Sequence, residues 1–593
     1  MVRLVSVSCV LAVVASLCGL VVAEEPIRFE DVTAQVGLAK YLDNWTLAHG
    51  AAWGDLNGDG KPDLYVGAFA DRKDWQADDA PIPNRLFFYT GKDFVPCDDP
   101  VIQLDKKYAR TSSVICVDLN NDGRQDLVVA NHASRASDCQ TAIFENLGGG
   151  RFKDVTPTGG GWPSPMGFRN VSAVDLNEDA LLDLVICDGN YSNWRKGGEW
   201  GGKLYLMENK GNFQFEDVSA RYGLPDTNSV GMGLAVGDVN DDGMMDFFVA
   251  DSNRMFVSGP DRKYRPCQDG TFVKPQVSDG DRHTCGAAFG DLNGDGLLDL
   301  VTTEHNQPSQ VRVYLNKGVT SGMPQFEQVT EQVGLGQEFP SLGMPVPGMS
   351  AEKPGGQGGG RAAAKAGKAG KAGRKADDGN AAQQQPVVAT APVANGMPVK
   401  STHVAIVDMD NDGRRDIVTA ILYMDDQNRL QPVVLRNVGQ PGAMPKFTRP
   451  PNDRLVVYTA PAPLADYDGD GKVDIFWATW WKNPHSMLFR NVTAGGNWLT
   501  VRVKGSGPKL NPMGIGAVVR AYAAGKAGDT KALLQRQDIV VGTGYSSGEQ
   551  ALAYLGLGQA KTCDVVVAWG KLTSTTANVP ANRLIEVNMS AGK

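Results

Sequence analysis

The chain lacks the sequence signatures of the common catalytic and redox sites. It contains no nucleophile elbow, no zincin helix motif, no phosphate-binding loop and no paired Cys and His ligands at metal-binding spacing. No two cysteines form a CxxC pair, so redox chemistry is not indicated. We therefore expect no enzymatic activity.

The cysteines leave the disulfide pattern open. The residues that follow position 23 include Cys97, Cys116, Cys139, Cys187, Cys267, Cys285 and Cys563. Cys116 and Cys187 lie within apolar runs and are predicted to be buried thiols. Cys97 with Cys139, or Cys267 with Cys285, remain open as local disulfides.

The N-terminus has the features of a secretory signal peptide. Arg3 precedes an apolar run from Leu4 to Val22, and Ala23 ends it just before two acidic residues. We assign residues 1–23 to this signal and expect an exported protein that is secreted, periplasmic or on the cell surface, with no stable membrane span after cleavage. A membrane anchor is the alternative, but Ser and Cys interrupt the run and no basic stop follows it.

An acidic loop recurs seven times, with Asp or Asn at positions 1, 3, 5 and 9. Gly occupies position 6 in every copy except the third, where Ala180 replaces it. We number the copies loops 1 to 7. The predicted metal ligands are, at positions 1, 3, 5, 7 and 9 of each loop in turn, Asp55, Asn57, Asp59, Lys61, Asp63; Asp118, Asn120, Asp122, Arg124, Asp126; Asp175, Asn177, Asp179, Leu181, Asp183; Asp238, Asn240, Asp242, Met244, Asp246; Asp291, Asn293, Asp295, Leu297, Asp299; Asp408, Asp410, Asp412, Arg414, Asp416; and Asp466, Asp468, Asp470, Lys472, Asp474.

These oxygen ligands, with a backbone carbonyl at position 7, are typical of Ca²⁺, and Mg²⁺ fits them less well. Gly at position 6 allows a sharp left-handed turn, so loop 3 is predicted to be the weakest site. The loops are not EF-hands, because position 12 holds Val66 and Val129 in the first two copies instead of a bidentate Glu. We expect up to about seven Ca²⁺ ions with a structural role.

Strands are predicted on both sides of each loop. Short runs of small or β-branched residues such as Gly50–Trp53 precede the loops and suit close packing near an axis, and alternating apolar residues follow them. Most copies continue with an apolar strand that ends in Asn-x-Gly and leads to Phe, which is a hairpin signal. Each unit therefore holds about four strands.

Four-stranded units at this period predict an all-β protein, a β-propeller over residues 24–495. Seven loops favour seven blades, while six or eight remain open because residues before Asp55 and after Asp474 may complete, add or share a blade. Residues 340–399 are rich in Gly, Ala, Lys and Pro and are predicted to be a disordered insert, either a solvated tether or a polyanion-binding segment.

The loops and their strands, over residues 50–490, resemble FG-GAP/VCBS repeats, the calcium-binding blades of integrin α propellers. Residues 496–593 resemble the ASPIC/UnbV domain that follows such repeats, through Asn497–Val503, Gly514–Val518, Gly542–Ser546, Leu555–Gly558 and Val565–Trp569. By pattern alone this segment predicts a small β-rich sandwich or barrel.

The resemblance implies an adhesion or ligand-binding module for a protein or polysaccharide outside the cytoplasm, with no nucleic-acid partner. An exported polysaccharide enzyme is the alternative, with Trp477, Trp480 and Trp481 lining a groove; a purely structural surface protein is a third. Polar residues where the second strands end, at Asn131-His132, Asp188-Gly189, Asp251-Ser252, Glu304-His305 and Trp480, are predicted to form a ring on one face. This ring either binds a ligand or a further metal, or consists of solvated strand ends with unrelated partners.

Overall fold

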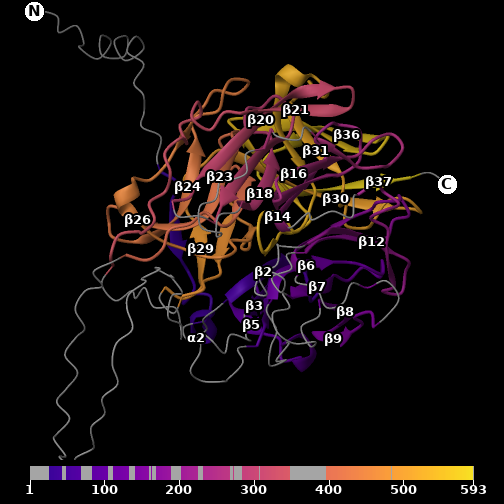
Figure 1. Ribbon diagram of the computed structural model, residues 1–593, viewed down its shortest axis with the longest axis horizontal. Helices are drawn as coiled ribbons and strands as arrows, with labels where there is room; N and C mark the ends of the chain where they lie inside the picture. Colours follow the sequence, from indigo (N-terminus) through magenta and orange to yellow (C-terminus); the bar gives the residue numbers. More distant parts are fainter. Residues whose placement is uncertain are drawn as a thin grey trace, which may run out of the picture.

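The computed structural model describes residues 26–42, 48–68, 83–103, 111–131, 141–158, 162, 168–188, 202–224, 231–267, 271–272, 284–305, 308–346, 396–481 and 484–591. Across these residues the protein is all-β, built from many small sheets (Figure 1). Within the described residues, helical structure is limited to α2 (Ala39–Leu42) and three 3-10 turns, η1 (Pro100–Gln103), η2 (Asn452–Arg454) and η3 (Thr530–Ala532).

Seven antiparallel sheets follow one another along the chain, each containing one acidic loop between its first two strands. Sheet 1 contains β2 (Ala48–Gly54), β3 (Asp63–Ala68), β4 (Arg85–Tyr89) and β5 (Phe94–Pro96). Sheet 2 contains β6 (Thr111–Val117), β7 (Asp126–Asn131), β8 (Ala142–Gly148) and β9 (Arg151–Asp154). Sheet 3 contains β10 (Phe168–Val174), β11 (Asp183–Asp188), β12 (Leu204–Asn209) and β13 (Phe215–Asp217).

The remaining four sheets repeat this order. Sheet 4 contains β14 (Gly231–Gly237), β15 (Asp246–Asp251), β16 (Arg254–Val257) and β17 (Arg265–Cys267). Sheet 5 contains β18 (Thr284–Gly290), β19 (Asp299–Glu304), β20 (Val311–Thr320) and β21 (Met323–Gln328). Sheet 6 contains β22 (Val404–Val407), β23 (Asp416–Met424), β24 (Leu430–Asn437) and β25 (Phe447–Thr448), with β26 (Leu455–Tyr458) paired to β23. Sheet 7 contains β27 (Leu464–Ala465), β28 (Asp474–Trp477), β29 (Met487–Asn491) and β1 (Phe29–Asp31).

Apolar clusters lie between consecutive sheets and also between the last sheet and the first. Tyr65 of sheet 1 shares a cluster with Phe144 of sheet 2, and Phe476 of sheet 7 shares one with Trp53 of sheet 1. Trp53 also donates to the carbonyl of Pro463 at 3.1 Å. Each sheet is therefore packed between two others, because a single sheet cannot bury both of its faces alone.

The N-terminal strand completes sheet 7. β1 pairs antiparallel with β29, so that Phe29 lies opposite Asn491. Residues before the first loop thus share a sheet with residues after the last, which was one of the alternatives that the sequence left open.

Small residues line the first strands, as their sequences predict. A Cβ on Gly50 would come within about 3.1 Å of the Ser113 backbone nitrogen in sheet 2, and one on Gly286 would reach the Thr402 carbonyl oxygen near sheet 6 at 3.0 Å. The first strands of neighbouring sheets contact one another directly from sheet 1 through sheet 6. Side chains at these positions would force the sheets apart.

Each acidic loop contains two left-handed residues. Position 6 has φ between 70° and 95° in all seven copies, including Ala180 at 70°. Position 4 is also left-handed throughout and is Gly, Asn or Asp except in loop 3, where Glu178 has φ 58°. Loop 3 therefore combines two residue types that do not favour this conformation.

The aspartate at position 9 closes each loop. In loop 3 the buried Asp183 accepts the backbone N–H of Leu176 through Oδ2 and that of Asn209 through Oδ1, both at 2.7 Å. The same two bonds recur in the other six copies, from loop position 2 and from the third strand or the residue just after it. One carboxylate thus fixes the corner where three strands meet.

The Asn of the predicted Asn-x-Gly hairpin has a second role that the sequence did not reveal. Asn209 accepts the N–H of Gly211, as a turn residue does, but its amide also donates to the Leu119 carbonyl of loop 2 at 2.8 Å. Asn146, Asn316, Asn437 and Asn491 make the equivalent bond to the preceding loop. These amides join neighbouring sheets at their loop ends.

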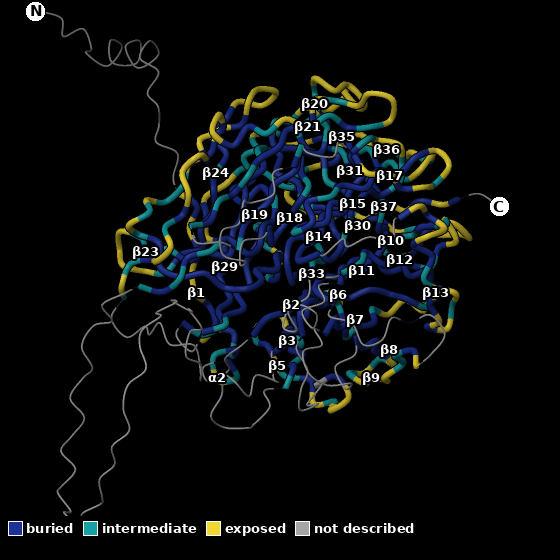
Figure 2. The backbone as a smooth tube through the Cα atoms, viewed as in Figure 1, coloured by how far each residue is buried: buried dark blue, intermediate teal, exposed yellow. Residues whose placement is uncertain are grey.

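The C-terminal domain has two sheets that share one apolar core. The first contains β34 (Ala553–Gly558), β30 (Asn497–Ser506) and β37 (Arg583–Ser590). The second contains β32 (Leu533–Asp538), β31 (Val518–Ala523), β35 (Thr562–Trp569) and β36 (Leu572–Pro580). A short strand, β33 (Ser547–Gly548), leaves this domain and pairs parallel with β2 of sheet 1, and Figure 2 shows it among buried strands at the middle of the molecule.

The structure corrects one of the two open disulfides. Cys267 and Cys285 are both free, because Cys267 is on the last strand of sheet 4 whereas Cys285 is on the first strand of sheet 5. Cys116 and Cys187 are buried thiols, as predicted. Cys97 is also free, and its suggested partner Cys139 lies outside the described residues.

The ends of the predicted insert pair with each other. Gly343 donates to the Met397 carbonyl at 2.8 Å, and Met344 donates to Leu455 of β26 at 2.5 Å. Met397 and Val399 are buried. The disorder predicted for residues 340–399 is therefore wrong at both ends, residues 340–346 and 396–399, which form these bonds. The rest of the insert, residues 347–395, and the signal peptide predicted for residues 1–23 lie outside the described residues. Within the part of the chain that the structure describes, no helix has the length and hydrophobicity needed to cross a bilayer.

The strain in loop 3 predicts opposite effects for two exchanges at position 6. We expect Ala180→Gly to raise stability by up to about 1 kcal/mol, because glycine removes the left-handed penalty of a β-carbon. Gly123→Ala in loop 2, at φ 87° with open space around the added Cβ, should lower it by about the same amount. Denaturation midpoints of both variants test this, and equal shifts of one sign would contradict it.

The bond between neighbouring sheets predicts a cost for losing one amide. Asn209→Ala should lower the free energy of unfolding by about 2 to 3 kcal/mol, because it leaves the buried carbonyls of Leu119 and Leu182 without their donor. Asn588→Ala, at an exposed position of β37, is the control and should shift it by less than about 0.5 kcal/mol. Equal destabilisation by both variants would refute a specific role for the buried amide.

Candidate metal centres

Carboxylates converge in the last two acidic loops. Oxygens of Asp408, Asp410 and Asp416 in loop 6 lie within 4.8 Å of one another, and so do those of Asp466, Asp468 and Asp470 in loop 7. These are residues of positions 1, 3, 5 and 9, which the sequence predicted as ligands. The loops bring them together because two left-handed residues turn the chain back on itself within five positions.

Each of these two groups contains a buried oxygen without a hydrogen-bond partner. Oδ1 of Asp410 and Oδ1 of Asp466 accept no hydrogen bond, although Asp410 is only 3% exposed. Buried carboxylates are costly unless they are paired. Both groups therefore fit a hard cation, which prefers several carboxylate oxygens together.

Cationic side chains already border these groups. Arg436 forms an ion pair with Asp410, and Arg490 contacts Asp470 at 3.2 Å. Their charge partly offsets that of the loops, but a guanidinium lies beside a carboxylate and does not replace a central ion that binds several oxygens at once.

The first five loops have Asn at position 3, and its amide is used within the loop. In loop 2 the Asn120 oxygen accepts the N–H of Asp122 at 3.1 Å, while its nitrogen donates to the same residue's carboxylate at 3.1 Å. Loops 3, 4 and 5 repeat both bonds, and loop 1 keeps the first. The structure thus holds positions 1, 3 and 5 in one compact turn.

The residues at position 7 were predicted to contribute their backbone carbonyls. Where position 7 is basic, the side chain folds back on the position 5 carboxylate: Lys61 on Asp59, Arg124 on Asp122, Arg414 on Asp412 and Lys472 on Asp470. Leu181, Met244 and Leu297 occupy the same position without such a charge. In all seven loops the position 7 N–H donates to the position 5 carboxylate.

Burial raises the pKa of the position 9 carboxyls, because desolvation opposes their charged form. The pKa of Asp63 and of Asp126 is raised to about 7, and that of Asp183 to about 8. Asp246, Asp299, Asp416 and Asp474 have pKa values well above the usual range for the same reason. A nearby cation would favour the ionised form and oppose this shift.

The polar residues at the ends of the second strands form local hydrogen bonds and ion pairs. Asn131 accepts a hydrogen bond from Thr111 at 3.0 Å, and Glu304 pairs with Arg312 at 2.8 Å. Among the described residues, no group of metal-binding side chains includes these strand ends. His132 and Gly189 lie outside the described residues. Binding of a ligand at these positions stays a prediction.

The tryptophans of the alternative groove are mostly core residues. Trp477 and Trp481 are at most 1% exposed and belong to the apolar cluster between sheets 6 and 7. Trp480 packs edge-on against His49. Val66 and Val129, at the position where an EF-hand has its Glu, are fully buried in strands, which agrees with rejecting that motif.

Comparison with protein families recovers both parts of the chain. Residues 48–72 match the FG-GAP repeat, residues 118–186 and 238–302 match the FG-GAP-like repeat, and residues 507–593 match ASPIC and UnbV. The matched repeats contain loops 1 to 5. Loops 6 and 7, whose carboxylates converge most closely, lie outside the matched residues.

Curated relatives are also found. The chain is 24% identical to human Cartilage acidic protein 1 over 519 residues, which cover 82% of this chain and 64% of that protein. Identity to the mouse protein of the same name is 23% over 517 residues, 82% of this chain and 66% of the relative. The chain thus spans somewhat less than two thirds of the length of these relatives.

Solved structures give weaker likenesses. The BP39L lectin from Burkholderia pseudomallei aligns with 78% of this chain and 99% of its own, at 11% identity and a TM-score of 0.37. The V. cholerae biofilm matrix protein Bap1 aligns with 95% of this chain and 85% of its own, at 13% identity and a TM-score of 0.28. Both scores are too low to support a conclusion. The family matches, together with the repeated loops and the separate C-terminal sheets, identify the chain as an FG-GAP repeat protein that ends in an ASPIC/UnbV domain.

Proposed function

We propose that the protein is an exported, calcium-stabilised β-propeller of seven blades that works as a ligand-binding or adhesion module outside the cytoplasm. The observation that carries the calcium proposal is the convergence of three carboxylates in loops 6 and 7, each with a buried oxygen that accepts no hydrogen bond. Protein or polysaccharide is the proposed ligand class.

Seven sheets in chain order, each packed between two others, support the propeller proposal. Pairing of β1 with β29 supports a closed ring, because it joins the two ends of the repeat region in one sheet. A propeller closed in this way is stabilised by backbone hydrogen bonds between distant parts of the sequence.

Calcium is the proposed ion because it accepts several carboxylate and carbonyl oxygens in flexible geometry, whereas magnesium requires a near-ideal octahedron. Within each loop, positions 1, 3, 5 and 9 would hold it together with the position 7 carbonyl. When bound, the ion supplies fixed positive charge and no reactive group. The carboxylates then tie the first strand of a sheet to the second and rigidify the loop.

A binding role is proposed over an enzymatic one. The chain has no catalytic motif, and a carboxylate that chelates calcium is a poor general base. The buried Trp477 and Trp481 do not line a substrate groove. Export is proposed from the apolar N-terminus and from the FG-GAP and ASPIC/UnbV families, whose members include many exported proteins.

Calcium binding predicts a definite stoichiometry. Calorimetric titration of the chelator-stripped mature protein should give six or seven ions, and thermal unfolding should shift upward as calcium is added, because the ion binds only the folded loops. Asp466→Asn should remove one ion. Asp453→Asn, on the exposed turn η2, is the control and should remove none. No binding in the wild-type protein would overturn the proposal.

A binding module predicts retention without turnover. The calcium-loaded protein should be retained on one of a panel of immobilised extracellular polysaccharides or proteins, and a chelator should release it. The bound polymer should keep its length, as size-exclusion chromatography can establish. Shortening of the polymer during incubation would instead support the enzymatic alternative.

A further inference from the structure

The C-terminal domain contacts three of the seven acidic loops through one strand. Residues 535–538 of β32 reach loop 4, loop 5 and loop 6. Loop 1, by contrast, makes no hydrogen bond or ion pair with this domain among the described residues. Loop 2 has a single contact, in which the Asp118 N–H donates to the Met513 sulfur at 3.1 Å. Because the loops are chemically alike, loop 1 is the undocked reference for the loops that this domain contacts.

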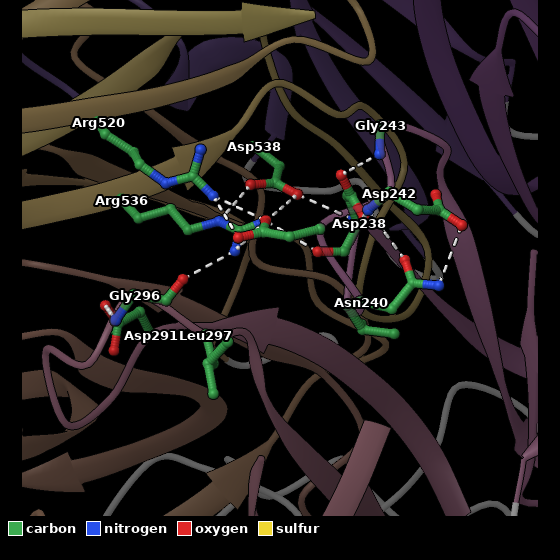
Figure 3. Close-up of polar contacts among 12 residues, drawn as sticks. Asp238, Asn240, Asp242, Gly243, Asp291, Gly296, Leu297, Arg520, Arg536 and Asp538 are labelled. Carbon is green, nitrogen blue, oxygen red and sulfur yellow. Dashed lines mark hydrogen bonds and ion pairs between the residues drawn. The ribbon is translucent and has the colours of Figure 1, made fainter. Parts of the chain in front are cut away.

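Arg536 joins loops 4 and 5. Its guanidinium is fully buried and donates to the carbonyl of Asp238, position 1 of loop 4, and to that of Gly296, position 6 of loop 5, both at 2.8 Å (Figure 3). It also pairs with Asp241 and with Asp538, each at 2.9 Å. Two loops from different sheets are thereby held at a fixed separation.

The surroundings of Arg536 leave its charge compensated. Asp538 accepts the N–H of Asp238 at 2.9 Å, so this carboxylate bridges the arginine and the loop backbone (Figure 3). Arg520 forms a second ion pair with Asp241, at 2.7 Å. If one partner of a buried ion-pair network is lost, the charge left behind is unpaired and the folded state is strongly destabilised. The conformation of loop 4 therefore depends on the docked C-terminal domain.

The C-terminal domain binds loop 6 at Asp408, the predicted ligand at position 1. Gln535 donates to Oδ2 of Asp408 at 2.6 Å, and its own oxygen accepts the N–H of Gly556. Buried Arg415, at position 8 of the loop, donates to the Arg536 carbonyl at 2.9 Å. The C-terminal domain therefore orients a proposed calcium ligand directly.

The residues that follow β32 enter the space between the first strands of the sheets. Gly544 donates to the Ala287 carbonyl of sheet 5 at 3.0 Å and accepts the N–H of Leu234 of sheet 4 at 3.1 Å. β33 then pairs with β2 of sheet 1. We call residues 541–548 the axial segment.

Glycine makes this insertion possible. Gly542 and Gly544 are left-handed, and a Cβ on Gly542 would overlap the Val171 carbonyl oxygen of sheet 3, while one on Gly548 would overlap that of Val114 in sheet 2. Tyr545 is buried, and its hydroxyl contacts His49 at 3.0 Å. A Cβ on Gly544 would likewise overlap the Val404 carbonyl oxygen of sheet 6. The axial segment thus fits closely against sheets 1 to 6.

We infer that calcium binding in loops 4 to 6 and docking of the C-terminal domain are coupled, so that calcium keeps the axial segment between the sheets and calcium removal releases it. The inference rests on the proposed function. Its physical basis is reciprocal: the domain holds loop residues in the conformation that binds the ion, and the ion holds the same residues in the conformation that binds the domain.

Hydrogen exchange of the full mature protein tests this coupling. In calcium, backbone amides of residues 535–548 should be protected. In a chelator they should exchange at least about tenfold faster, a change within the range of measured couplings between sites. Amides of β6 and β10, which are paired within their own sheets, report whether the repeat region stays folded.

Two variants at the same loop position form the matched comparison. Asp242→Asn in loop 4 should speed exchange of the axial segment in calcium, whereas Asp59→Asn in loop 1 should remove an ion without this effect. Should Asp242→Asn fail to fold, Arg520→Gln, at a partly exposed position, should speed exchange of residues 535–548 and weaken the affinity for one ion.

The outcomes separate the two proposals. Calcium bound at the expected stoichiometry, with equal protection of the axial segment in calcium and in chelator, would overturn the coupling and leave the calcium-binding proposal intact. Equal effects of Asp242→Asn and Asp59→Asn would also overturn it. Absence of calcium binding would overturn both.

Discussion

The carboxylate at position 9 of each acidic loop is buried, and both of its oxygens accept backbone N–H groups. Asp183 shows the arrangement, with one bond to the start of its loop and one to Asn209 at the end of the third strand. A carboxylate without water is costly unless it is paired. Here the two hydrogen bonds hold the ends of three strands together at one corner of the sheet. The position of the loop and the pairing of the strands therefore depend on the same carboxylate.

The same corners also carry the contacts between sheets. Asn209 accepts the N–H of Gly211 in its own sheet and donates to the Leu119 carbonyl in the loop of the preceding sheet. One side chain therefore links the loop ends of two neighbouring sheets. A cation in the loop would act on the same few residues. Local strain is accepted at these corners: even Ala180 takes a left-handed conformation there, because the bonds around it determine the backbone.

The C-terminal domain uses the loops in a different way. Arg536 donates hydrogen bonds to carbonyl oxygens of two loops. The chain then continues into the axial segment, which occupies the space between the first strands. While the domain is docked, a ligand cannot enter that space.

Local chemistry is what the sequence determined by itself. Acidic residues at fixed offsets, glycine at position 6 and Asn-x-Gly turns determine the backbone over only a few neighbouring residues. The loops, their left-handed turns and the hairpins can therefore be predicted from the sequence. The tertiary structure decided the rest. That β1 completes sheet 7, that Cys267 and Cys285 lie on different sheets, and that Arg536 joins two loops all depend on which distant surfaces fit together. No local pattern encodes such complementarity, because packing selects it only after the sheets have formed.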